Sequence, residues 1–185
     1  SMADVRSGLF VSLAEWAAKN VKDLSARQER AWKPNILVPI RDADTLRGSF
    51  LFVQDLAAPK GAVNLLGLDS KAASDDLARQ IEDITSAFRK RGVFASSAVV
   101  SADRFAPSLT ASIQTLQGAF FKPNILFLPL PDDDERERDY GQLVHTASEQ
   151  QMGTCIYAPH RRAGLGQRET VNVWINDRSP DWKVS

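Results

Sequence analysis

The stretch Trp32-Lys33-Pro34-Asn35-Ile36-Leu37 recurs later in the chain as Phe121-Lys122-Pro123-Asn124-Ile125-Leu126. Each copy continues into a short apolar run, Val38–Ile40 after the first and Phe127–Leu130 after the second. Proline has no backbone N–H to donate to a sheet ladder, so it is tolerated at the first residue of a strand. The repeated phrase therefore predicts two equivalent strands at the heart of one parallel sheet.

Apolar strands alternate with helical segments along the rest of the chain. The predicted strands are Asn35–Ile40, Ala62–Leu68, Val93–Ser101, Ile125–Leu130 and Thr154–Ala158. The predicted helices are Leu46–Leu56, a segment around Leu77–Phe88 that ends at Gly92, Pro107–Gly118, and a helix that opens at Asp132–Glu135. Such alternation is typical of parallel βαβ units with helices on both faces of the sheet. We predict an α/β, doubly wound, five-stranded and mainly parallel sheet of order 3-2-1-4-5, with an added edge strand at Val171–Asn176.

A long amphipathic helix is predicted ahead of the first strand, over Gly8–Arg30. Its apolar residues, among them Leu9, Leu13 and Trp16, recur at helical spacing and form one stripe. This stripe needs a surface to lie on, which could be the domain itself, a second copy or a neighbouring part of a longer chain. The opening Ser1-Met2 reads as a tag-cleavage scar. We therefore expect two parts: residues 1–31, which hold the scar and the helix, and residues 32–185, which form the α/β domain.

The composition narrows the classes of partner. The 185 residues carry 23 basic and 23 acidic side chains, so the formal net charge is zero. Neither half of the chain has a large excess of basic residues. A nucleic-acid or anionic-membrane partner therefore has no electrostatic support. A single cysteine, Cys155, allows no internal disulfide and fits a reducing compartment, and we interpret it as filler of the last predicted parallel strand. No run approaches the roughly 18 apolar residues of a membrane span.

Acidic residues follow the two central strands, at the point where a doubly wound sheet usually binds its ligand. Asp42 comes after the first strand of the repeat, and Asp132 and Asp133 come after the second. A phosphate site needs glycines there, so that backbone N–H groups can approach an anion. A divalent cation held by these three carboxylates is conceivable. We prefer the simpler interpretation, acidic helix starts that complement the helix dipole, and predict no metal and no cofactor.

The remaining chemistry-bearing residues form no recognisable catalytic set. His145 falls within a predicted helix, and His160 stands in a basic loop that could contact a phosphate but reads better as charged surface. Sequence spacing does not exclude a Ser-His-Asp or Cys-His arrangement, because the members of a catalytic triad need only meet in space. No nucleophile elbow and no zinc-type ligand spacing is present in the sequence. We therefore predict a domain that is not an enzyme and has no catalytic residues of its own.

The two Lys-Pro-Asn phrases and the ending Val173–Trp182 occur in the order and at the spacing of a known family. With them, the chain resembles the cytoplasmic C-terminal domain of prokaryotic cation–chloride cotransporters, which belong to the amino acid–polyamine–organocation transporter superfamily. The likeness extends from about Trp32 to Trp182. It implies a fold related to universal stress proteins. ATP-binding members of that group carry a Gly-x-x-Gly loop after strand four, where this chain has Pro131 and an acidic run.

The resemblance also implies a function. The chain would be a regulatory and dimerisation domain of a Na-K-Cl-type cotransporter, a soluble piece of an integral membrane protein at the cytoplasmic face of the cell membrane. Its partners would be the transmembrane domain of the same polypeptide, joined through the Gly8–Arg30 helix, and a second copy, with no direct lipid binding. Phe10, Trp16 and Trp182 are candidate interface anchors, since aromatic residues often bury against a partner, or else they cover the domain's own core. The alternative is a free-standing, universal-stress-like nucleotide-binding protein.

Overall fold

The computed structural model describes residues 2–24, 33–70, 75–118, 122–129 and 134–157. Strands and helices alternate along them, after one leading helix. In chain order they are α1 (Met2–Leu24), β1 (Asn35–Ile40), α2 (Ala43–Ala57), β2 (Ala62–Asp69), α3 (Asp75–Lys90), β3 (Phe94–Ser101), α4 (Phe105–Gln117), β4 (Ile125–Pro129), α5 (Asp134–Glu149) and β5 (Gly153–Tyr157).

The five strands form one parallel sheet in the order β3-β2-β1-β4-β5. This confirms the predicted order and puts the two strands of the repeated phrase, β1 and β4, side by side at the centre. Their pairing is short, because it runs only through Ile36–Ile125 and Leu37–Leu126. By contrast, β1 pairs with β2 along its whole length. The predicted edge strand Val171–Asn176 lies outside the described residues.

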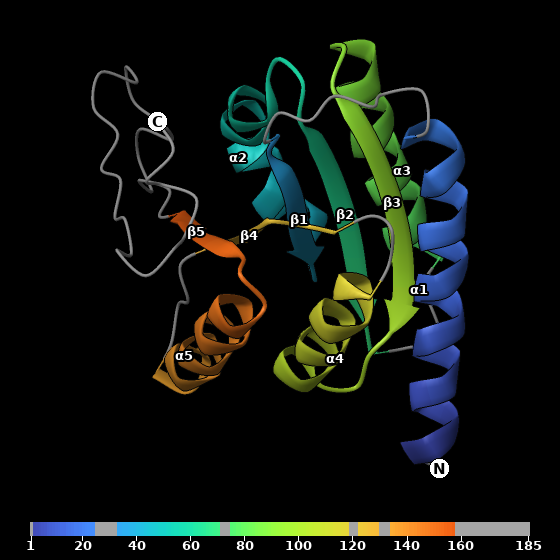
Figure 1. The fold of residues 1–185 in the computed structure, drawn as a ribbon, viewed down its shortest axis with the longest axis vertical. Coiled ribbons are helices and arrows are strands. Elements are labelled where there is room, and N and C mark those ends of the chain that lie inside the picture. Colours follow the sequence, from blue (N-terminus) through green and yellow to red (C-terminus); the bar gives the residue numbers. More distant parts are fainter. Residues whose placement is uncertain (1, 25–32, 71–74, 119–121, 130–133, 158–185) are drawn as a thin grey trace.

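Helices cover both faces of the sheet (Figure 1). On one face, α2 and α3 bury a core that includes Val53, Ile81 and Phe88 against β1 and β2. On the other face, α4 and α5 supply a second core with Leu109 and Leu143. The strands β1 and β2 are buried along almost their whole length, which explains why they read as continuous apolar runs rather than alternating ones.

The leading helix α1 belongs to the second of these layers. It lies over β3 and beside α4, along the edge of the sheet (Figure 1). Leu13 and Trp16 are 1% and 5% exposed and join the core of that face. With this strand order, the crossovers α4 and α5 lie toward β4 and β5, so the face of β3 needs another cover. Of the three surfaces considered for the apolar stripe, the domain itself receives it.

Local capping decides where two helices begin and end. Helix α2 begins at Ala43, three residues before the predicted Leu46, because Asp42 is extended and its side chain accepts a hydrogen bond from the N–H of Asp44 at 3.1 Å. Helix α3 ends at Lys90, and Gly92 has a φ of 79°, which glycine adopts without strain. The predicted stop at Gly92 is therefore confirmed, whereas the predicted start of α2 is wrong.

Gly61, between α2 and β2, is expected to tolerate no side chain. A Cβ there would lie 2.5 Å from the carbonyl oxygen of Ala57 and 2.6 Å from that of Pro34, and neither backbone group can move freely. We expect Gly61→Ala to lower the free energy of unfolding by about 1–3 kcal/mol, measured by urea denaturation. The control is Gly48→Ala on the outside of α2, where a Cβ meets nothing and a gain of about 0.5–1 kcal/mol is expected. Equal effects at the two positions would contradict the close packing at Gly61.

Candidate functional site

A crevice lies where β1 and β4 end, at the switch point of the sheet. Its volume is about 290 Å³. Its walls combine aromatic and charged side chains, among them Arg41, Asp42, Phe105, Phe127, Asp139 and Tyr140. The Arg41 guanidinium stands over the Phe105 ring, 5.4 Å from its centre, so this cation is held against the wall by a cation–π contact. The crevice is therefore in the position expected of a ligand site.

The acidic residue Asp42 at this crevice acts as a helix start. Asp42 is exposed and caps α2, and Asp44 in the first turn pairs with Arg47 at 3.0 Å on the helix surface. Asp132 and Asp133, the other two carboxylates considered for a cation, lie outside the described residues. Within the residues that the structure describes, no three side chains of the metal-binding types come together. The interpretation of Asp42 as an acidic helix start is confirmed.

At the opposite end of the sheet, the two repeated phrases bind each other. The side-chain N–H of Asn35 donates to the carbonyl oxygen of Lys122, and that of Asn124 donates to the carbonyl oxygen of Lys33, each at 2.7 Å. The backbone N–H of Asn35 also donates to the Asn124 side chain at 2.7 Å. We call this reciprocal arrangement the asparagine clasp. Each asparagine binds the backbone just before the other, which gives the repeat a structural purpose.

A line of buried polar side chains leads from this clasp to α1. The Trp16 indole N–H donates to Ser96 Oγ at 3.1 Å, and Ser96 Oγ donates to Asn64 Oδ1 at 2.9 Å. The Asn64 amide in turn donates to Asn35 Oδ1. Asn64 is fully buried and Ser96 is 6% exposed, so these bonds satisfy groups that would otherwise be costly to bury. This polar line, Trp16–Ser96–Asn64–Asn35, joins the helix to three successive strands.

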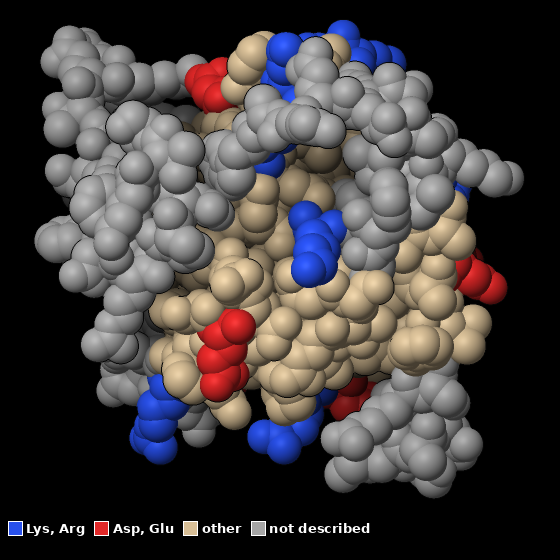
Figure 2. All heavy atoms as spheres, viewed as in Figure 1, with Lys and Arg blue, Asp and Glu red and all other residues tan. Residues whose placement is uncertain are grey.

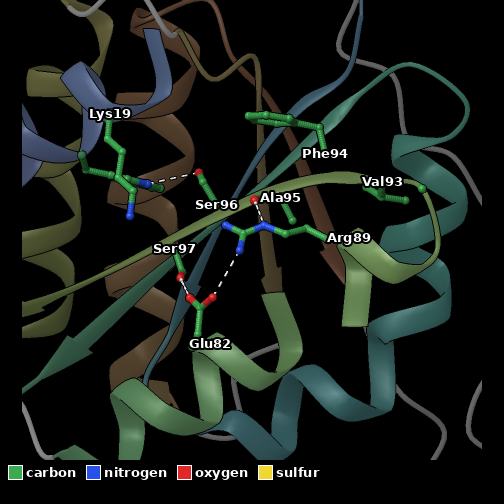
Figure 3. A pocket seen from close by; sticks show the side chains of 10 residues that line it. Lys19, Glu82, Arg89, Val93, Phe94, Ala95, Ser96 and Ser97 are labelled. Atoms are coloured by element: carbon green, nitrogen blue, oxygen red, sulfur yellow. Dashed lines mark hydrogen bonds and ion pairs between the residues drawn. The ribbon is translucent and has the colours of Figure 1, made fainter. Parts of the chain in front are cut away.

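A second hollow, of about 510 Å³, runs along the free edge of β3 between α1 and α3 (Figure 3). Arg89 of α3 reaches across it and donates its Nε–H to the carbonyl oxygen of Ala95 at 2.9 Å. Glu82 holds the same guanidinium at 3.2 Å and accepts from Ser97 Oγ at 3.0 Å. Arg89 thus occupies an outward-facing acceptor of the edge strand, which discourages edge-to-edge association.

The distribution of charge can be followed on one face of the molecule. On the face drawn in Figure 2, the basic and acidic residues that the structure describes are scattered and form no large patch of one sign. Among the described helices, none is both long enough and apolar enough to cross a bilayer.

Comparison with known proteins identifies the family. Residues 38–165 match the first part of the C-terminal domain of prokaryotic cation–chloride cotransporters. The chain belongs to this family. It is also similar to a crystal structure of the cytoplasmic domain of a prokaryotic cation chloride cotransporter, with 38% sequence identity and a TM-score of 0.63. That similarity covers 73% of this chain and 49% of the other, so the chain matches about half of that domain. No curated protein matches the chain.

The three candidate anchors predicted for this cotransporter-family chain lie in different settings. Phe10 is 60% exposed on α1, whereas Trp16, on the same helix, is 5% exposed and packs into the domain's own core. Trp182 lies outside the described residues. The structure therefore brings Phe10 and Trp16 onto one helix but onto different sides of it.

The other singled-out residues have ordinary surroundings. Cys155 is part of β5 and half-buried, as predicted for strand filler, and burial raises the pKa of its thiol above the usual value. His145 is exposed on α5 and lies 3.3 Å from Glu149, one turn along the helix. His160 is outside the described residues.

The asparagine clasp and the polar line were not predicted from the sequence of this cotransporter domain. One signal was available, because asparagine follows proline in both copies of the phrase. A buried asparagine in the middle of an apolar strand, Asn64, was a second signal. Polar residues in buried strands are usually hydrogen-bonded, so these positions could have been singled out together.

Proposed function

We propose that this chain is the cytoplasmic regulatory and dimerisation domain of a cation–chloride cotransporter of the Na-K-Cl type, and that it is not itself an enzyme. In this proposal it lies at the cytoplasmic face of the cell membrane. Its partners are the transmembrane domain of the same polypeptide and a second copy of itself. It needs no cofactor, no metal and no nucleic acid, and it makes no direct contact with lipid. Family membership supports the transporter assignment.

The docking of α1 is the observation that carries the regulatory role. The helix precedes the family match, which starts at residue 38. In this proposal, α1 is the connector from the membrane-embedded part. It is not a loose tether, because Leu13 and Trp16 are buried in the sheet's own core. A force on α1 must therefore act on β3 and, through the polar line, on β2 and β1. Contiguous packing and hydrogen bonding of this kind supports a coupling between α1 and the sheet, which a change in transport rate would demonstrate.

Transport by the full-length protein tests this function. Reconstituted in liposomes, it should take up cations only when chloride is present. Trp16→Phe keeps the ring but removes the hydrogen bond to Ser96, so we expect the maximal uptake rate to change by at least about twofold. The apparent affinity for the ions should stay the same, because Trp16 is outside the ion pathway.

The control is Leu51→Ala, an exposed position on the outside of α2, which should leave uptake unchanged. Uptake that does not depend on chloride would contradict the transporter assignment. Identical rates for the native protein and Trp16→Phe would contradict the regulatory role.

A further inference from the structure

Helix α1 is apolar on two sides, and only one of them is covered. Leu13 and Trp16 face the sheet and are buried. On the outside, Phe10 and Val11 are 60% and 53% exposed. A helix that is apolar on more than one side is normally covered on each of them. The outer side of α1 therefore has the composition of a contact surface.

This outer side stands out among the described residues. Four large apolar side chains are exposed among the described residues: Phe10, Val11, Leu51 and Ile156. Only Phe10 and Val11 are neighbours, whereas Leu51 and Ile156 are isolated on α2 and β5. A single exposed apolar residue needs no explanation, but an adjoining pair on a helix that already buries its other side does.

Small residues continue the outer side along the helix. Ala14 and Ala18, one turn apart, are both exposed and follow Val11 at helical spacing. Alanines present little side chain, so a second helix can approach the backbone closely at this turn. Glu15 and Lys19, also exposed, lie one turn apart on one side of the alanines and carry opposite charges. Lys19 also lines the hollow between α1 and α3. We call Phe10, Val11, Ala14 and Ala18 the outer stripe.

We propose that the outer stripe of α1 pairs with the same stripe of a second copy, in antiparallel orientation. With Ala14 of each copy facing Ala18 of the other, Phe10 and Val11 pack toward the two ends. Glu15 of each copy then comes alongside Lys19 of the other, twice by symmetry. This self-complementarity of size and charge is what a two-fold interface requires, and it favours a second copy over an unrelated partner.

The position of α1 permits this contact. The helix stands at the edge of the molecule, next to β3 (Figure 1). The residues of the outer stripe are all exposed. The inference rests on the proposed dimerisation and specifies the surface that carries it. It also connects that surface to the polar line, since the opposite side of the same helix turn holds Trp16.

Sedimentation equilibrium of this chain tests the pairing. The native chain should dimerise, and Ala18→Arg should raise the dimer dissociation constant by at least about a hundredfold, because it places bulk and charge at the centre of the contact. The control is Leu51→Arg, which puts the same charge on the exposed side of α2 and should leave the dimer intact.

Disulfide cross-linking gives a second measurement that needs no disruptive change. In a Cys155→Ser background, a mixture of Ala14→Cys and Ala18→Cys chains should form the mixed disulfide faster than either chain forms its own. A native dimer that survives Ala18→Arg and forms no mixed disulfide would overturn the pairing but leave dimerisation standing. A native chain that stays monomeric at every concentration would overturn both. If Ala18→Arg fails to fold, the cross-link alone decides.

Discussion

Replacing Trp16 by alanine is expected to lower the free energy of unfolding by about 3–5 kcal/mol. The side chain is 5% exposed and fills the layer between α1, β3 and α4, so its removal leaves a cavity that the sheet cannot close. The substitution also removes the donor to Ser96 Oγ at the end of the polar line. Urea denaturation followed by circular dichroism measures this change.

Two further substitutions separate packing from hydrogen bonding at α1. Trp16→Phe keeps most of the buried ring and loses the N–H, so a smaller loss of about 1–3 kcal/mol is expected. Phe10→Ala, on the exposed side of the same helix, should change stability by at most about 0.5 kcal/mol in the monomer. If Trp16→Ala and Phe10→Ala cost the same, α1 is not part of the core in solution.

The second large effect is expected at the asparagine clasp. Asn124→Asp replaces the amide that donates to the carbonyl oxygen of Lys33 with a carboxylate that can only accept. The new oxygen would face another acceptor at a half-buried position, so we expect a loss of about 2–4 kcal/mol at neutral pH. The free energy of unfolding from urea titrations again provides the measurement.

This loss should depend on pH in a defined direction. Facing a carbonyl oxygen, the introduced carboxyl has a folded-state pKa above its unfolded value of about 3.9. The penalty is therefore complete above the folded-state pKa and shrinks as the pH falls toward the unfolded value, because the protonated acid can donate again. Asn124→Ala has no proton to regain and serves as the control. A penalty for Asn124→Asp that is equal at about pH 5 and about pH 8 would rule out the acceptor–acceptor contact.

Much of the fold could be predicted from local patterns. The two Lys-Pro-Asn phrases predicted equivalent strands, and the alternation of apolar runs with helical segments predicted a doubly wound parallel sheet, whose proposed strand order is confirmed. Gly92 marked the end of α3 because glycine alone adopts a φ of 79° easily. The start of α2 was misplaced because its first turn, from Ala43, carries few apolar residues and is specified instead by the Asp42 cap.

The site was harder to predict, since its parts meet only in three dimensions. Nothing local reveals that Asn35 and Asn124 bind each other's preceding backbone, because that contact depends on β1 and β4 being neighbours. Trp16 was a candidate for an interface anchor or for a cover of the domain's own core, and periodicity alone does not tell which surface a stripe covers. That surface follows from the strand order, which leaves the face of β3 to be covered by α1.

The short pairing of β1 with β4 divides the sheet into two parts, β3-β2-β1 and β4-β5. The asparagine clasp joins the two parts where β1 and β4 begin, and the pairing between these strands stops after Leu37 and Leu126. The clasp consequently holds the two parts of the sheet together at one end. We therefore expect the two parts of the sheet to separate first at the crevice end, where no pairing between β1 and β4 resists, and to stay in register at the end that the clasp holds.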